Sequence, residues 1–203
     1  MNANLNEILA AREHRRDRQE ELLRQFSRPL ICFTMNIPGP EKNHFLVSYG
    51  FALGDRLLRE ALPAGKLLQD TRRGTAAGPE GFYVVDASPE ELKAICVRLE
   101  EKTPGGRVFD LDVLRPDGSK VERRELGLPE RKCLLCGEPA AVCGRSRNHS
   151  LPRLQEKTWQ LLAEGISRDI GRMAVQSLLC ELYATPKPGL VDQNNNGSHG
   201  DMD

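Results

Sequence analysis

Residues 109–113 alternate between apolar and acidic side chains, and this pattern constrains the fold more than any other stretch of the chain. Its apolar members favour a β-strand, on which Asp110 and Asp112 project from the same face. Two neighbouring carboxylates repel each other unless a cation lies between them. A hard divalent cation such as Mg²⁺ prefers carboxylate oxygens and often also binds substrate phosphates. The pattern therefore predicts either a magnesium site or a strand whose solvent face is acidic.

Composition narrows the class of protein. The chain has 203 residues with 29 basic and 29 acidic side chains, a length that suits one full domain with room for the start of a second. Zero net charge gives no general attraction to nucleic acid, so an anionic partner would need a local basic patch. No apolar run approaches the roughly 20 residues that span a bilayer, and the N-terminus has no secretory signal. We expect a cytoplasmic protein without a membrane or nucleic-acid partner.

Periodicity predicts an α+β fold with a small mixed or antiparallel sheet flanked by helices, plausibly nucleotidyltransferase-like. Ser88 and Pro89 are typical of a helix start, and we expect that helix to end near Thr103. We expect three further helices, over 4–26, around 51–62 and over 151–183; the last is a helical C-terminal extension with weak points at Gly165 and Gly171. We expect strands over 29–37 and 82–85, with a mobile basic loop over 64–81. After the acidic strand, a turn at 116–118 should lead to a second strand near Val121.

Two local features carry further expectations. Gly105 and Gly106 precede the acidic strand, and glycine allows a bulky ligand to approach the backbone closely. In the first helix, Arg12 and Arg16 lie one turn apart. Such a charged run is usually a solvated helix face, and the alternative is that the two arginines bind a phosphate.

Six cysteines are unevenly placed, with three of them inside residues 133–143. This placement favours reduced thiols or a metal site over a disulfide framework. Cys133 and Cys136, followed by a glycine, have the form of a zinc knuckle, which Cys143 and His149 could complete as a Cys₃His site. The alternative is that Arg145, Arg147 and His149 form an anion-binding strip while the cysteines simply pack.

Taken together, these segments resemble the apo-citrate lyase phosphoribosyl-dephospho-CoA transferases. The resemblance covers residues 5–165 and rests on five matching stretches: Arg12-Glu13-x-Arg15; Thr34-Met35-Asn36-Ile37-Pro38-Gly39-Pro40-Glu41-Lys42-Asn43; Gly106-Arg107-Val108-Phe109-Asp110-Leu111-Asp112-Val113; Leu126-Gly127-Leu128-Pro129; and Cys133-Leu134-Leu135-Cys136 through Cys143-Gly144-Arg145-Ser146-Arg147-x-His149. Gly144 is a small departure, because alanine is expected there.

The resemblance implies a nucleotidyl transfer onto a protein hydroxyl. The donor would be 2′-(5″-triphosphoribosyl)-3′-dephospho-coenzyme A and the acceptor a serine of the apo acyl-carrier subunit of citrate lyase, with release of pyrophosphate. Metal ions assist such transfers by neutralising charge on the attacking and leaving oxygens. Asp110 and Asp112 would then be catalytic Mg²⁺ ligands. The expected donor-binding residues are Lys42, Asn43, Arg107, Arg12, Arg145 and Arg147.

The tail resembles a second family. Residues 181–192 and 196–203 are similar to the opening of a triphosphoribosyl-dephospho-CoA synthase, the enzyme that makes the donor. We therefore expect a transferase domain over 1–165 and a truncated piece of a helical synthase domain over 166–203, without synthase activity and with a poorly ordered tail. The alternative for the tail is a flexible Asn/Gly-rich terminus. A rival function for the whole chain is a zinc-stabilised module that binds the carrier protein without catalysis.

Overall fold

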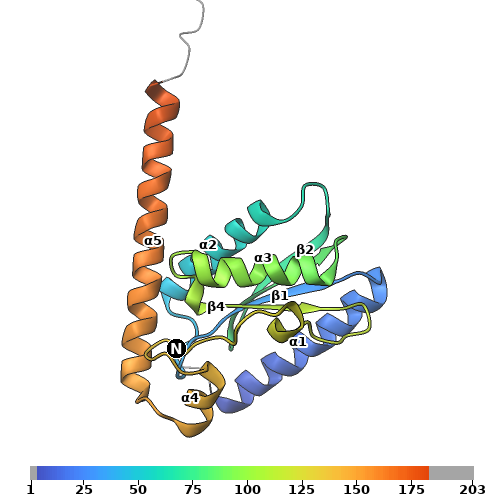
Figure 1. The fold of residues 1–203 in the computed structure, drawn as a ribbon, viewed down its shortest axis with the longest axis horizontal. Coiled ribbons are helices and arrows are strands. Elements are labelled where there is room, and N and C mark those ends of the chain that lie inside the picture. Colours follow the sequence, from blue (N-terminus) through green and yellow to red (C-terminus); the bar gives the residue numbers. More distant parts are fainter. Residues whose placement is uncertain (1–3, 183–203) are drawn as a thin grey trace, which may run out of the picture. The chain divides into compact units, whose positions relative to one another are not determined.

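A computed structural model describes residues 4–182 of the chain. Of these, the residues up to Ile170 form one compact unit, and residues 171–182 belong to a second. The first unit contains a four-stranded sheet with the order β2-β3-β1-β4, in which every pair of neighbouring strands is antiparallel (Figure 1). The strands are β1 (Leu30–Met35), β2 (Leu67–Thr75), β3 (Gly78–Val85) and β4 (Phe109–Leu114). The predicted α+β fold is confirmed, and the sheet is antiparallel rather than mixed.

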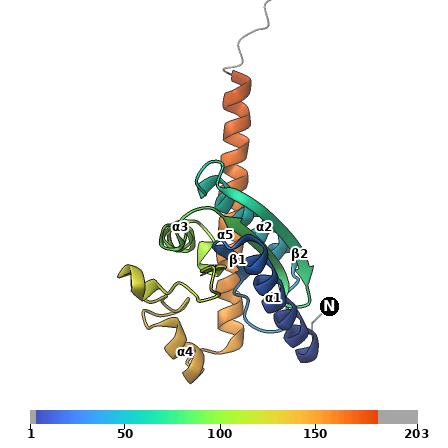
Figure 2. The same ribbon diagram turned by 90° about the vertical axis from the view of Figure 1, so that its right-hand side faces the viewer.

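Five α-helices are described, and three of them pack on the faces of this sheet. The five are α1 (Leu5–Phe26), α2 (Phe45–Ala61), α3 (Pro89–Lys102), α4 (Ala140–Ser146) and α5 (Leu151–Leu182). Helices α2 and α3 cover one face and α1 lies on the opposite face (Figure 2). Helix α5 confirms the predicted helix from residue 151, and the synthase-like tail from residue 183 lies outside the described residues.

The alternation of β1 divides the core into two layers. Ile31 and Phe33 point to the α2 and α3 side, where they join the main apolar cluster. Leu30 and Cys32 point to the other side and pack with Leu22 and its neighbours on α1. The register then fixes the acidic pair: in the sheet, Thr34 lies opposite Asp110, and Cys32 lies opposite Asp112. Both carboxylates therefore share the α1 face of β4, as the sequence predicts.

Local signals explain the ends of two helices. Ser88 Oγ accepts a hydrogen bond from the Glu91 N–H at 3.1 Å, and Pro89 is the first residue of α3. Both features satisfy or remove N–H groups that a helix leaves unpaired at its start. Asn4 caps α1 in the same way, with a reciprocal bond from its backbone N–H to Glu7. The predicted bounds of these two helices are confirmed.

The expected basic loop over residues 64–81 is wrong, because these residues form the β2–β3 hairpin. Strand β2 lies at the edge of the sheet, where polar and charged side chains are common and the apolar signal is weak. Its arginines are held by partners that are distant in sequence: Arg72 pairs with Asp55 at 3.0 Å, and Arg73 pairs with Glu80 at 2.6 Å. Composition alone could not reveal these pairs.

The predicted second strand near Val121 is reduced to an isolated antiparallel bridge between Leu114 and Lys120. The turn itself is present, since the Gly118 N–H donates to Arg115 O at 2.9 Å and Gly118 has a positive φ of 84°. After Val121, which donates to Val113 O at 2.9 Å, the chain leaves the sheet. The turn residues therefore predicted correctly that the chain reverses direction, but they did not ensure that a paired strand follows the turn.

The glycines before β4 serve packing between segments rather than the approach of a ligand. A Cβ on Gly106 would lie 2.2 Å from the carbonyl oxygen of Leu99 in α3. Gly165 in α5, expected to be a weak point, lies against the same turn, and a Cβ there would approach Pro104 O to 2.8 Å. Helix α5 continues through this glycine because the missing side chain lets two backbones meet.

Candidate functional site

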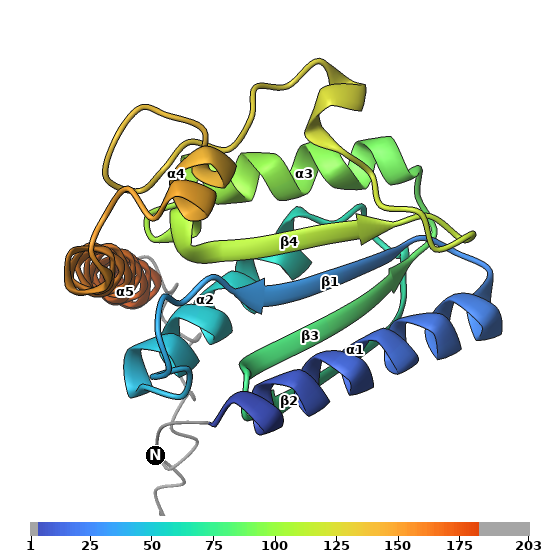
Figure 3. The same ribbon diagram turned by 90° about the horizontal axis from the view of Figure 1, so that it is seen from below.

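A small polar cavity of about 140 Å³, called here the α1 cleft, lies between the N-terminal half of α1 and the ends of β1 and β4. Figure 3 shows this side of the sheet, with α1 running beside β3 while β4 lies farther from it. The cleft draws on segments that are distant in sequence: α1, β1 and the residues after it, the β2–β3 turn, and β4. Its lining consists of Ile8, Arg12, Arg15, Thr34, Met35, Asn36, Ile37, Lys42, Ala77 and Asp110.

Two of the predicted donor-binding cations meet in the α1 cleft. Lys42 is half-buried, and its ammonium donates to the carbonyl oxygen of Ile37. Burial lowers the pKa of Lys42, and the nearby positive charge of Arg12 lowers it further. Two cations that repel each other in one cleft form a site that a bound anion would stabilise. The structure thus brings Arg12 and Lys42 together, as a phosphate-binding role requires.

The second arginine of α1 in the cleft is Arg15 rather than Arg16. Arg15 Nε donates to Glu80 Oε2 at 2.6 Å, and Arg73 Nε donates to the other oxygen of the same carboxylate at 2.6 Å. Glu80 is fully buried, whereas Arg16 is exposed and does not line the cleft. Positions i and i+3 lie on the same helix face as well as i and i+4, so helical spacing allowed either Arg15 or Arg16 beside Arg12 and could not choose between them.

The two carboxylates of β4 have different surroundings. Asp110 lines the α1 cleft and accepts a long hydrogen bond of 3.4 Å from Thr34 Oγ1. Its pKa is raised by burial and by repulsion from Asp112. Asp112 lies outside the cleft lining and pairs with Lys120 Nζ at 2.7 Å. Asp110 is therefore the carboxylate better placed to meet a ligand in the cleft.

Arg131 takes a position beside Asp110 that the sequence did not reveal. Its guanidinium lies 3.4 Å from Asp110 Oδ1 and donates to the carbonyl oxygens of Arg107 and Phe109 at 2.6 and 2.7 Å. Arg131 lies between the proline at 129 and the first cysteine of the knuckle, and no local sequence pattern there predicts a role at the site. Only the folding of the knuckle against β4 brings it to the acidic strand.

Two other predicted donor-binding residues point elsewhere. Arg107 donates to the carbonyl oxygens of Lys132 and Cys133 at 2.6 and 3.3 Å and does not line the α1 cleft. The Asn43 amide donates to Thr75 O at 3.0 Å, so it ties the loop after β1 to the β2–β3 hairpin. Both side chains hold loops around the site, and neither meets Lys42 at the cleft.

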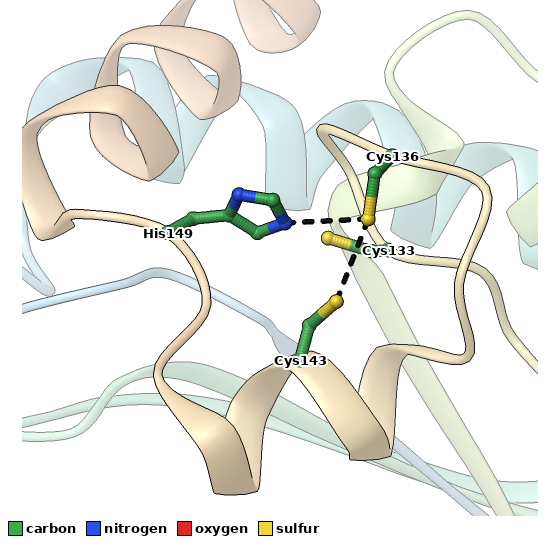
Figure 4. A group of neighbouring side chains, drawn as sticks. All are labelled: Cys133, Cys136, Cys143 and His149. Atoms are coloured by element: carbon green, nitrogen blue, oxygen red, sulfur yellow. Dashed lines mark hydrogen bonds between the residues drawn. The ribbon is translucent and has the colours of Figure 1, made fainter.

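Arg145 and Arg147 are exposed at the end of α4 and do not line the α1 cleft. The His149 ring instead turns towards Cys136, with Nε2 3.3 Å from its sulfur (Figure 4). This arrangement disfavours the anion-binding strip. It favours the other interpretation of this segment, in which the histidine belongs to the cysteines.

Cys133, Cys136, Cys143 and His149 form one cluster, whose potential ligand atoms all lie within 4.8 Å of one another (Figure 4). Cys133 and Cys143 are buried, and all three cysteines of the cluster are free thiols. Burial would raise the pKa of the Cys133 thiol, but the backbone N–H groups of Leu135 and Cys136 hold it below its usual value. The cluster could bind a metal such as zinc.

A second cavity of about 280 Å³ adjoins this cluster. It is lined by members of the cluster and by residues near the acidic strand, and Asn36 lines both this cavity and the α1 cleft. Its remaining lining includes apolar atoms of Pro38, Leu134 and Leu154. A polar cleft next to a larger and more apolar cavity suits an elongated ligand with a charged end.

The sequence profile of apo-citrate lyase phosphoribosyl-dephospho-CoA transferases matches residues 3–165. The chain belongs to this family. It is 38% identical over 166 residues to the "Apo-citrate lyase phosphoribosyl-dephospho-CoA transferase" of Citrobacter koseri, covering 81% of this chain and 91% of that protein. With the protein of the same name from Escherichia coli O7:K1 it shares 37% identity over 158 residues, covering 77% and 86%.

A longer relative matches beyond the transferase family segment. "Protein CitXG" of Haemophilus influenzae is 34% identical over 202 residues, which is 98% of this chain. The matched region is 43% of that relative, so the chain spans less than half of its length. Among the described helices, none is long and apolar enough to cross a membrane.

Proposed function

We propose that this protein attaches the prosthetic group of citrate lyase to its carrier subunit. The donor is 2′-(5″-triphosphoribosyl)-3′-dephospho-coenzyme A, and the acceptor is a serine hydroxyl of the apo acyl-carrier subunit. The serine oxygen forms a bond to the α-phosphorus of the donor, the bond to the outer two phosphates breaks, and pyrophosphate leaves. Membership of the transferase family over residues 3–165 supports this assignment.

The observation that carries the proposal is the combination of charges in the α1 cleft. Arg12, Arg15 and Lys42 line one cavity together with Asp110. Phosphoryl transfer needs cations that hold the triphosphate and neutralise the charge on the leaving group. Arg suits phosphate as a planar fork and Lys as a point charge. We assign the triphosphate to these three cations and the reacting phosphorus to the side near Asp110.

Magnesium fits the acidic strand through its oxygen donors. Asp110 and Asp112 share one face of β4, and their mutual repulsion raises the pKa of Asp110. A divalent cation there would relieve this repulsion and, when bound, neutralise charge on the triphosphate oxygens. Asp110 would be the principal ligand, because Lys120 already pairs with Asp112. Zinc fits the separate cysteine–histidine cluster, whose sulfur and imidazole donors suit it.

The remainder of the donor would occupy the larger cavity beside the cysteine–histidine cluster. Asn36 lines both cavities, so a molecule bound with its phosphates in the α1 cleft can extend into the second one. The apolar atoms of that lining suit the less polar parts of a coenzyme A derivative. Arg131 lines this second cavity and contacts Asp110, which places a cation at the junction.

We also propose that residues 1–165 are the transferase domain and that residues 166–203 correspond to the first part of a synthase domain. The match to "Protein CitXG" covers 202 residues, whereas the matches to the two transferases cover 166 and 158. The additional similarity therefore lies in a part of the longer relative that those proteins do not share with this chain.

Mass spectrometry of the carrier subunit tests the principal proposal. The apo-carrier is incubated with donor, Mg²⁺ and this protein, and we expect its mass to rise by the prosthetic group while pyrophosphate is released. A carrier in which the acceptor serine is alanine is the matched control and should stay unmodified. Binding of the carrier without a change in mass would contradict the proposal and would favour the non-catalytic binding module.

A further inference from the structure

The cysteine–histidine cluster has the dimensions of a closed zinc site. Cys136 Sγ lies 3.5 Å from Cys143 Sγ and 3.3 Å from His149 Nε2. Sulfurs bound to one tetrahedral zinc at about 2.3 Å lie about 3.8 Å apart, and a nitrogen ligand shortens the separation. The four potential ligand atoms all lie within 4.8 Å of one another. Small shifts, which separate the closest atoms slightly and draw the more distant ones together, would bring all four to bonding distance of one ion.

Four protein ligands leave no coordination position for substrate or water, which is typical of structural rather than catalytic zinc. The ligands come from three separate segments: the knuckle around Cys133 and Cys136, helix α4 with Cys143, and His149 just before α5. The Leu135 N–H also points to Cys133 Sγ at 3.5 Å, as expected for an amide that stabilises a thiolate. A metal at this point would join segments that little apolar surface holds together.

The knuckle is the tip of a short hairpin whose first residue is Arg131. The Cys133 N–H donates to Glu138 O at 2.8 Å, and the Ala140 N–H donates to Arg131 O at 2.7 Å. Lys132 and Pro139 form an antiparallel bridge between these two bonds. The backbone of Arg131 is thus tied to the start of α4, which carries the third cysteine ligand.

The side chain of Arg131 leaves this hairpin towards β4. Two carbonyl oxygens, of Arg107 and Phe109, accept from its guanidinium, which also lies 3.4 Å from Asp110 Oδ1. Arg107 makes a second connection between the same two segments, since its guanidinium donates to the carbonyl oxygens of Lys132 and Cys133. The metal cluster and the acidic strand are therefore linked through two arginines that bond in opposite directions.

We propose that Cys133, Cys136, Cys143 and His149 bind one structural Zn²⁺, which clamps the hairpin of residues 131–140 and thereby holds Arg131 beside Asp110. Arg131 is a positioning residue: it acts through Asp110 and through the carbonyl groups at the start of β4. The zinc site and the clamp stand on geometry alone, whereas the consequence for phosphate binding rests on the proposed function of the α1 cleft.

Metal analysis of the full chain tests the site. We expect close to one zinc per chain after purification without chelator, and cobalt replacement should give the intense absorption of a tetrahedral, thiolate-bound ion. The variant Cys136→Ser should lose most of this metal. The matched control Cys96→Ala changes a fully buried thiol of α3 outside the cluster and should keep it. Wild-type protein without near-stoichiometric zinc, and without a tetrahedral cobalt spectrum, would overturn the site.

Hydrogen exchange tests the clamp without any use of the reaction. Removing zinc with a chelator should speed exchange in peptides that cover residues 131–143 by at least about tenfold, because the bonds of the hairpin open more often. Peptides of β1 and β3 should keep their protection, which also shows that the core remains folded. Unchanged exchange in the hairpin of metal-free protein would overturn the clamp.

Binding of inorganic tripolyphosphate in the presence of Mg²⁺ tests the link to the cleft. We expect zinc removal and Arg131→Ala each to weaken this binding about tenfold, and zinc removal from Arg131→Ala protein to weaken it by less than about twofold more. Arg131→Lys should restore only part of the affinity, since one ammonium replaces two guanidinium nitrogens, of which Nη2 donates to both carbonyl oxygens while Nη1 faces Asp110. Additive losses, or full affinity in metal-free protein, would overturn the link. A failure of carrier modification alone would affect the proposed function and leave the site and the clamp standing.

Discussion

Arg15 on α1 and Glu80 on β3 are 65 positions apart in the sequence and form an ion pair with a separation of 2.6 Å. The carboxylate is fully buried, and Arg73 bonds to its second oxygen. A buried carboxylate is tolerated because two guanidinium groups satisfy it. This shared carboxylate ties α1 to the sheet and holds Arg15 at the α1 cleft, so it joins the stability of the fold to the geometry of the site.

Glu80→Gln should destabilise the fold by about 3 kcal/mol, because the two guanidinium groups lose their common counter-charge. Urea denaturation monitored by circular dichroism measures this loss. Glu21→Gln is the control: it breaks the exposed pair between Arg18 and Glu21 on α1, and such pairs contribute about 0–1 kcal/mol. Equal effects of the two substitutions would show that burial of Glu80 does not matter.

Arg12→Ala should raise the KM for the donor about 10-fold to 100-fold, since a charge-assisted hydrogen bond to phosphate contributes about 1.5–3 kcal/mol. Steady-state kinetics of pyrophosphate release measures the change. Arg16→Ala is the matched control, because Arg16 is exposed on the same helix and does not line the cleft. An effect at Arg16 as large as that at Arg12 would instead favour the alternative in which both arginines bind the phosphate.

Asp110→Asn should lower kcat by a factor of about 100 or more, because an amide cannot neutralise a divalent cation as a carboxylate does. Asp112→Asn should have a smaller effect, since Asp112 pairs with Lys120 outside the cleft lining. Single-turnover modification of the carrier measures both. An Asp110→Asn protein that keeps most of its transfer activity would exclude the proposed metal role.

Gly165→Ala should destabilise the protein, because the new Cβ would lie 2.8 Å from Pro104 O and 3.1 Å from Gly105 Cα, and neither backbone atom can move easily. We expect a loss of about 1–3 kcal/mol. Gly171→Ala in the same helix has open space around the new methyl group and should gain up to about 1 kcal/mol of helix stability. Thermal melts of the two variants should therefore shift in opposite directions.

Stability should fall as the pH rises above about 9. Burial raises the pKa of the Cys32 thiol from 9.0 to about 12, although a hydrogen bond from Gln19 opposes the shift. In this window the unfolded chain loses the thiol proton while the folded chain keeps it, so folding becomes less favourable by up to about 1.4 kcal/mol per pH unit. Below pH 9 both states are protonated and this contribution does not change.

Urea denaturation of wild type and Cys32→Ala at pH 7.5, 9 and 10.5, under reducing conditions, isolates this contribution. The variant starts from lower stability because it leaves a small cavity, but it should lose less stability on going from pH 9 to 10.5. Parallel curves for the two proteins would show that Cys32 does not cause the alkaline loss.

Several elements could be predicted from the sequence because their signals are local. The alternation in 109–114 gave both the strand and the shared face of Asp110 and Asp112, and Ser88 with Pro89 gave the start of α3. Strand β2 was missed, since its polar residues are satisfied by partners such as Asp55 and Glu80 from other elements. The side chains that stabilise an edge strand of this kind lie on other elements, so the residues of the strand itself do not predict it.

For the candidate sites too, the sequence predicted what depends on local signals and missed what depends on distant partners. The sequence by itself determined the family motifs, the acidic pair, the choice of Lys42 and Arg12 as candidate phosphate-binding residues, and the four residues of the cysteine–histidine cluster. Only the tertiary structure decided that Arg15 and Arg131, rather than Arg16 and Arg107, stand at the cleft and at Asp110. The reason is physical: side-chain direction follows the local period of a helix or strand, whereas the partner of a charge depends on which distant segments pack together.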